Sequence, residues 1–85
     1  MRTHKLKIWP EAFSAVRANQ KRAEIRKNDR KFMVGDTVRL QEWDPLTRRY
    51  TGQEEIRKIA HIQQGTRFGI RRGHVLISMK RGTEL

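Results

Sequence analysis

The stretch DTVRLQEW, residues 36–43, has the clearest alternation of apolar and polar side chains in the chain. Val38 and Leu40 fall on one face of an extended backbone, and the polar side chains between them fall on the other. We therefore expect a strand with one buried face. Continued alternation would turn Glu42 inward and Trp43 outward, which indicates either a bulge or a strand that leaves the core.

Segments on both sides of this stretch also have the pattern of strands. They are residues 4–8, 21–27 and 74–80. In residues 21–27 the alternation predicts that Ala23 and Ile25 point inward, whereas apolar side chains on both faces of residues 74–80 predict a central strand. Residues 54–63 fit a helix through Ile56, Ile59 and Ala60, or a strand through Ile56, Ala60 and Ile62 with a defect at Lys58. We favour the strand because the segment follows a hairpin connection and is rich in isoleucine.

One helix is expected directly after the first strand. Trp9, Ala12, Phe13 and Val16 recur at the spacing of one helical face, and Pro10 suits a first helical turn. Trp9 and Phe13 are therefore expected in the core. Five short strands and one early helix predict an α+β fold, and a small partly closed barrel would protect the sheet edges.

Length and composition limit the class of protein. The 85 residues make one domain, residues 1–85, and the absence of cysteine excludes disulfides and thiolate metal sites. There is no apolar run of membrane-spanning length and no signal-peptide core, so we expect a cytoplasmic protein without a membrane partner. His4, His61 and His74 lack metal-ligand spacing, and no phosphate-binding glycine loop is present. We therefore predict no metal and no cofactor.

The net charge of +11, from 20 basic and nine acidic residues, is the strongest indication of function. A sequence pI near 11.3 is typical of nucleic-acid-binding domains. The excess is +6 in residues 1–30, +1 in residues 31–60 and +4 in residues 61–85. If the two ends of the chain meet in the fold, they would build one positive face.

The stretch KRAEIRKNDR, residues 21–30, places Glu24 among five basic side chains. Lys21, Glu24 and Arg26 form a K-x-x-E-x-R element, and all three would line one cleft if Lys21 lies at the turn between helix and strand. The carboxylate could accept hydrogen bonds from a base, or it could hold Lys21 or Arg26 in position for a phosphate. The alternative is a surface ion pair worth less than about 1 kcal/mol.

The aromatic candidates for stacking on bases are Trp9, Trp43, Tyr50 and Phe68. Trp43 falls on the polar face beside Arg39. Phe68 lies between Arg67 and Gly69 in a basic loop, where it could contact a base or plug the mouth of the barrel. We favour the plug.

Four motifs together resemble a phage and bacterial branch of the activating signal cointegrator homology (ASCH) superfamily. They are L-K-I-W-P, K-x-x-E-x-R-K-N-D-R, V-G-D-T-V and E-W-D-P, and the resemblance covers residues 4–80. It implies a PUA-like fold, a small mixed β-barrel with flanking helices. It also implies that Lys21, Glu24 and Arg26 line a cleft that takes RNA or a modified nucleoside.

Some members of that superfamily hydrolyse an acyl group from a modified cytidine. They are similar to this chain at Lys21 but carry threonine in place of Glu24 and a later glutamate. Here the last strand offers His74 and no acid before Glu84, so the catalytic set is incomplete. Lys21 and Glu24 would be the catalytic residues of an enzyme, but we favour a protein without catalytic activity.

The sequence thus predicts binding of RNA or single-stranded nucleic acid in a basic cleft. The alternatives are a hydrolase acting on a modified nucleoside and a phage accessory protein that binds an acidic protein. The residues predicted to contact nucleic acid are Lys5, Lys7, Lys21, Glu24, Arg26, Lys27, Arg30, Trp43 and Phe68.

Overall fold

The computed structural model describes residues 1–82 of the chain. The elements in chain order are β1 (Thr3–Ile8), α1 (Pro10–Arg17), β2 (Ala23–Lys27), β3 (Thr37–Asp44), β4 (Arg49–Gln64) and β5 (His74–Lys80). The strands form one sheet in the order β1-β3-β4-β5-β2, in which β1 pairs parallel to β3 and the other pairs are antiparallel. The α+β class, the five strands and the early helix are confirmed, and β5 is a central strand as predicted.

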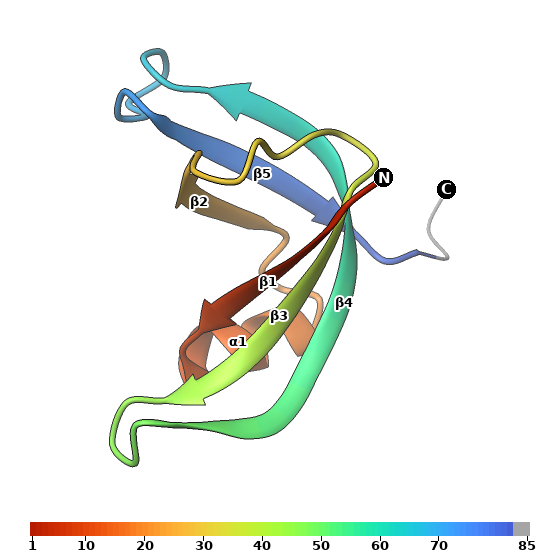
Figure 1. The fold of residues 1–85 in the computed structure, drawn as a ribbon, viewed down its shortest axis with the longest axis vertical. Helices are drawn as coiled ribbons and strands as arrows, with labels where there is room; N and C mark the ends of the chain where they lie inside the picture. The colour runs from red at the N-terminus through yellow and green to blue at the C-terminus, as the bar shows by residue number, and fades with distance from the viewer. Residues whose placement is uncertain (83–85) are drawn as a thin grey trace.

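The sheet curls into a half-barrel that stays open on one side (Figure 1). The 16-residue strand β4 runs through both halves and pairs with β3 along its first part and with β5 along its second. The edge strands β1 and β2 border the opening, which we call the seam. The helix α1 packs against β3 and β4.

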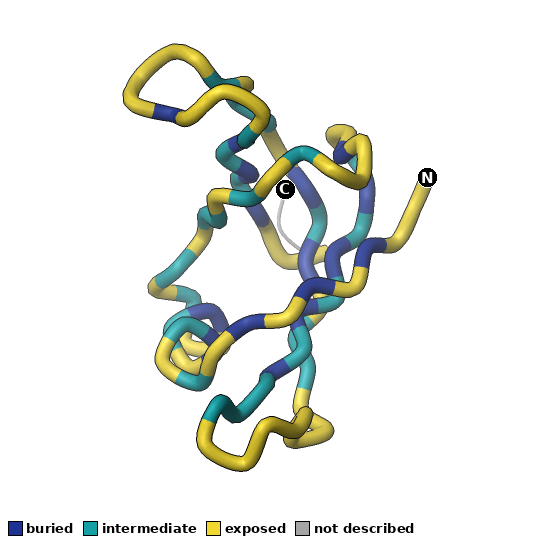
Figure 2. Tube along the Cα trace, turned by 60° about the vertical axis from the view of Figure 1, so that its left-hand side comes forward, coloured by how far each residue is buried: buried dark blue, intermediate teal, exposed yellow. Residues whose placement is uncertain are grey.

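The core lies on the concave side of the sheet. Buried positions alternate with exposed ones along β1 and with half-buried ones along β5 (Figure 2), as the two-residue period of a strand requires. The helix adds Phe13 and Val16, and Phe32 covers the core from the connection between β2 and β3. The other apolar residues of this core cluster are Leu6, Ile8, Val38, Leu40, Ile59, Val75, Ile77 and Met79.

Two bulges bend the sheet. The register between β3 and β4 shifts between Gln41 and Trp43, and Glu42 turns inward, where Thr51 Oγ1 donates a 2.8 Å hydrogen bond to it. A second shift, between Ile59 and His61, separates the two halves of β4. The bulge predicted near Glu42 is confirmed, and extra residues of this kind increase strand bending and twist.

Residues 54–63 form part of a strand as predicted, but their inward side chains differ from the expected ones. Arg57 and Ile59 are buried, whereas Ile56 and Ala60 are exposed. Arg57 and Ile59 take the inward positions of the alternation, so Ile56 and Ala60 face outward. The bulge after Ile59 brings Ile62 onto the inward face, where it packs against the core.

Two predicted core positions are wrong. Trp9 is 54% exposed because it caps the start of α1 on an extended backbone and does not belong to the helical face that carries Phe13. Ile25 is 59% exposed, because Glu24 and Arg26 lie opposite Ile77 and Val75 and so share the concave face with them. The charged row of β2 therefore faces inward along the seam.

Candidate nucleic-acid interface

Glu24 joins the three residues of the K-x-x-E-x-R element into one cluster. Its Oε1 lies 3.3 Å from Lys21 Nζ, and its Oε2 lies 3.2 Å from the Nη2 of Arg26. The carboxylate is mostly buried and the two cations are partly exposed. The structure therefore brings these three predicted residues together at the seam.

The end of α1 places Lys21 within reach of Glu24. Asn19 adopts a left-handed backbone with φ 62°, and the N–H groups of Gln20 and Lys21 both donate to the carbonyl of Ala15. This tight turn ends the helix. Because Lys21 precedes β2 and lies in the turn, strand alternation does not direct it away from Glu24.

Arg26 and Arg30 cross the seam to the edge of β1. Arg26 Nη2 donates to the carbonyl oxygen of Lys7 at 2.5 Å, and Arg30 Nη1 donates to the carbonyl oxygen of Lys5. Both cations thus stabilise the fold, in addition to any contact with phosphate. The hollow beside them has a volume of about 130 Å³ and is lined by Leu6, Arg26, Lys27, Asp29, Arg30 and Phe32.

Three other predicted residues lie on the outer face of the sheet, apart from the Glu24 cluster. The ammonium of Lys7 lies 4.3 Å from the ring centre of Trp43. The double hydrogen bond from Arg39 lowers the pKa of Glu54, and Lys5 nearby lowers it further. Lys5, Lys7 and Trp43 therefore form a separate outer surface, and one face of the indole is already covered.

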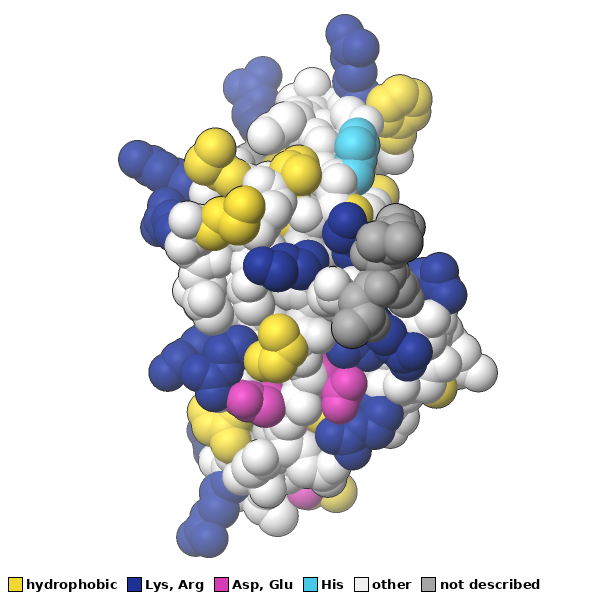
Figure 3. All heavy atoms as spheres, turned by 90° about the vertical axis from the view of Figure 1, so that its right-hand side faces the viewer, with side chains coloured by type: hydrophobic (Ala, Val, Ile, Leu, Met, Phe, Trp, Pro, Cys, Tyr) yellow, Lys and Arg dark blue, Asp and Glu magenta, His cyan; other side chains and the backbone are white. Residues whose placement is uncertain are grey.

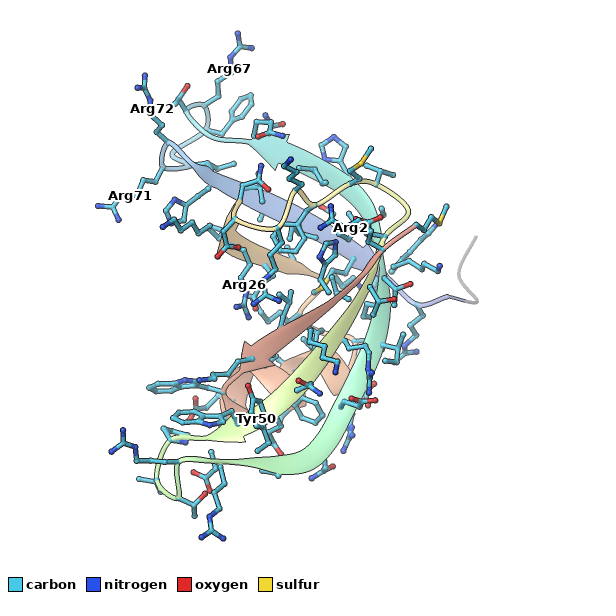
Figure 4. The ribbon with its side chains drawn as sticks, viewed as in Figure 1. Arg2, Arg26, Tyr50, Arg67, Arg71 and Arg72 are labelled. Carbon is cyan, nitrogen blue, oxygen red and sulfur yellow. The ribbon has the colours of Figure 1, made fainter. Side chains whose placement is uncertain are left out.

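Phe68 lies in the loop of residues 65–73 between β4 and β5, which we call the tip loop. Its side chain is 82% exposed, so the prediction that it plugs the barrel is wrong. The loop projects beyond the sheet, and a ring at its end has no core to enter. Figure 4 shows Arg67, Arg71 and Arg72 pointing outward from the same loop, far from Tyr50 on the opposite arm.

Sequence reasoning missed the arginines of the tip loop as candidate ligand contacts. Within residues 1–82, Arg67, Arg71 and Arg72 form no ion pair, whereas Arg17, Arg39 and Arg57 are paired with glutamates. The sequence feature that could have identified them is the position of Phe68 among arginines in a loop bounded by Gly65 and Gly73.

Positive charge is not confined to the seam. Figure 3 shows Lys and Arg side chains spread over another face of the molecule, with few acids between them. Lys58 and Lys80 are direct partners across β4 and β5 there, and they line a hollow of about 290 Å³ with Met1 and Ala60. The single positive face expected if the chain ends meet is therefore not formed.

Residues 1–82 contain neither a metal-binding cluster nor a membrane-spanning helix. In residues 1–82, no three His, Cys, Asp or Glu side chains are grouped so that they could hold a metal ion. Across those residues, no helix has the length and apolar character needed to cross a membrane.

Comparison with known proteins places the chain in a family. Over 40 residues it is 45% identical to an uncharacterised 12.9 kDa protein in the GpA 3′ region of Escherichia phage P2. That similarity covers 47% of this chain and only 37% of the phage protein. Residues 3–79, nearly the whole fold, match the family described as a domain of unknown function, DUF3850. The chain belongs to the DUF3850 family.

Proposed function

We propose that the protein binds single-stranded nucleic acid at the seam, with RNA as the favoured ligand. The observation that carries the proposal is the cluster in which Glu24 holds Lys21 and Arg26. Of these three residues, Arg26 also lines the hollow of about 130 Å³. A carboxylate that contacts two cations fixes their orientation, so that both cations are already in position when a phosphate binds.

The overall charge supports a polyanionic ligand. A net charge of +11 on 85 residues creates a field that attracts polyanions and speeds their association. The resemblance to the ASCH superfamily and its PUA-like fold is our reason for placing RNA before DNA. A cytoplasmic location accords with such a ligand.

Binding accounts for the geometry at Glu24 better than hydrolysis does. Both of its oxygens contact cations, at 3.3 Å and 3.2 Å, an arrangement that suits a fixed negative charge. A general base would need a free oxygen directed at the proton it removes. We therefore place nucleic-acid binding ahead of a hydrolase for modified nucleosides.

The test is fluorescence anisotropy with labelled single-stranded RNA of about 12 nucleotides, at about 50 and 200 mM salt. We expect tight binding at low salt that weakens steeply at high salt, because phosphate contacts release counterions. Lys21→Ala should weaken binding by roughly 10-fold, as expected for the loss of one charge-assisted contact. Lys80→Ala, which removes the same charge from the exposed end of β5, should have an effect of less than about 3-fold.

Each rival function has its own outcome. No binding at low salt, or equal losses for both lysine variants, would exclude the seam as the site. Equal affinity for poly-glutamate would favour an acidic protein partner. Turnover of an acylated cytidine that Lys21→Ala abolishes would establish the enzyme.

A further inference from the structure

The tip loop combines unpaired cations with an exposed aromatic ring. Arg67, Arg71 and Arg72 form no ion pair with any described carboxylate, and they point into solvent (Figure 4). Phe68, in the same loop, is 82% exposed. An apolar ring of this size is normally buried, because its transfer out of water is favourable by about 2–3 kcal/mol. The pairing of ring and cations is therefore the feature to explain.

Hydrogen bonds give the tip loop a defined shape. The N–H of Ile70 donates to Arg67 O at 3.0 Å, and the N–H of His74 donates to Arg71 O at 3.0 Å. Gly65 passes so close to Arg71 that a Cβ at Gly65 would lie 2.2 Å from its carbonyl oxygen. Ile70 of the loop is buried. The loop is thus anchored by short internal contacts.

This anchored loop holds Phe68 away from the core. The residue has φ 57°, a left-handed backbone that is unfavourable for a bulky side chain. Gly69 continues the turn with φ 77°. Ile70 in the same loop is buried, whereas the backbone presents the ring of Phe68 to solvent at a conformational cost.

The tip loop is joined to the seam. The N–H of Asn28 donates to Gly73 O at 2.8 Å, and Lys27 is the direct partner of His74 across β2 and β5. Lys27 also lines the hollow beside Arg26. A chain of phosphates that leaves the seam along Lys27 therefore reaches the arginines of the tip loop.

We infer that the tip loop is a base-stacking site, in which one unpaired base lies on Phe68 and the adjoining phosphates contact Arg67, Arg71 and Arg72. Nucleic acid offers a flat aromatic face beside every negative charge of its backbone, which is the combination that Phe68 and the neighbouring arginines would contact. The face of a base is open to an aromatic side chain when the base is unstacked, so the ligand is single-stranded at this point. The inference rests on the proposed function and adds a second contact to it.

The experiment uses single-stranded RNA with 2-aminopurine placed at successive positions, because the fluorescence of this base falls when it stacks. The wild-type chain should quench the fluorophore at one position or at two adjacent ones. Phe68→Ala and Phe68→Leu should both remove the quenching and weaken binding by about 10-fold, and Phe68→Trp should retain both. Leucine keeps an apolar side chain without a flat ring, so this variant separates stacking on a base from a purely apolar contact.

Leu46→Ala is the matched control. Leu46 is 92% exposed in the turn between β3 and β4, close to Arg48, and so is an apolar side chain beside an arginine without an aromatic face. Its loss should change affinity by less than about 2-fold, as for a surface site outside the interface.

The two proposals fail in different ways. Suppose that RNA binds at low salt, but Phe68→Ala quenches the 2-aminopurine fluorescence and binds RNA as wild type does. The stacking proposal is then wrong and the seam proposal stands. If Phe68→Leu binds like wild type while Phe68→Ala is weaker, the contact is apolar and stacking is likewise wrong. If the wild type binds no RNA, both proposals fall.

Discussion

The guanidinium of Arg26 reaches across the seam to the carbonyl oxygen of Lys7, 2.5 Å away, and so connects the two edge strands of the sheet. β1 and β2 form no ladder with each other, which leaves backbone groups of β1 without a neighbouring strand. A side-chain donor from β2 satisfies one of these groups. The half-barrel is therefore held together at its opening by arginines instead of strand pairing.

The double variant Arg26→Lys and Arg30→Lys tests this connection. Lysine keeps the charge but lacks the planar fork that binds carbonyl and carboxylate together. We expect the free energy of unfolding to fall by about 1–2 kcal/mol, which lowers the melting temperature by roughly 4–16 °C in a domain of this size. Circular dichroism melts would measure this. Arg48→Lys, in the turn before β4, should melt like wild type, and an unchanged double variant would mean that the seam is not held by these contacts.

Glu24 provides a test of selectivity. Glu24→Gln removes a negative charge from the seam, so affinity for RNA in general should stay equal or rise. If the carboxylate also accepts a hydrogen bond from a base, preference among the four homopolymers should fall by up to about 10-fold. Anisotropy titrations with each homopolymer would show this. An equal loss of affinity for all four would contradict base recognition and would indicate that Glu24 serves only to orient Lys21 and Arg26.

Asp36 makes the stability of the fold depend on pH in the acidic range. Burial raises the pKa of this carboxyl, but hydrogen bonds from His4 Nε2 at 2.8 Å and from the N–H groups of Arg2 and Met33 outweigh it and hold the pKa below its ordinary value. Because the unfolded chain binds the proton first, the stabilisation is complete above about pH 4 and is lost as the pH falls through the folded-state pKa.

Urea unfolding of wild type and Asp36→Asn at pH 6 and pH 3 would measure this contribution. We expect the variant to lose roughly 2–4 kcal/mol at pH 6, since two partly buried N–H groups and His4 lose a charged acceptor. The variant should also depend less on pH below pH 4. Some dependence remains, because the pKa values of Glu54 and Glu55 are lowered too. Equal pH dependence in both chains would exclude Asp36 as a source.

The sequence predicted those elements in which pattern and burial coincide. β3 and β5 were identified because apolar side chains at Val38, Leu40, Val75 and Ile77 mark their buried faces. The same rule failed for Ile25, because the inner face of an edge strand at an open seam is not covered by apolar side chains. Polarity therefore indicates burial only where another layer of the fold covers the strand.

The candidate site was predictable in part. The convergence of Lys21, Glu24 and Arg26 depended on the turn after α1, which alternation alone does not specify. The tip loop was harder to predict, because 20 basic residues give no sign of which ones are already paired. Only the fold shows that carboxylates engage Arg39 and Arg57 and leave Arg71 and Arg72 unpaired among the described residues.

The backbone of Phe68 leads to a prediction that separates its effect on stability from its effect on binding. Glycine adopts φ 57° without the steric cost of a side chain, and the exposed ring contributes little packing to the fold. The free energy of unfolding of Phe68→Gly should therefore equal that of wild type or exceed it by up to about 1 kcal/mol. The gain is small because the relief of strain is partly offset by a more flexible unfolded chain. RNA affinity should still fall by about 10-fold. Phe68→Ala, which keeps a side chain at this φ, should not gain stability. A loss of more than about 1 kcal/mol in Phe68→Gly would show that the ring packs against the fold, and the case for a ring held ready for a ligand would be lost.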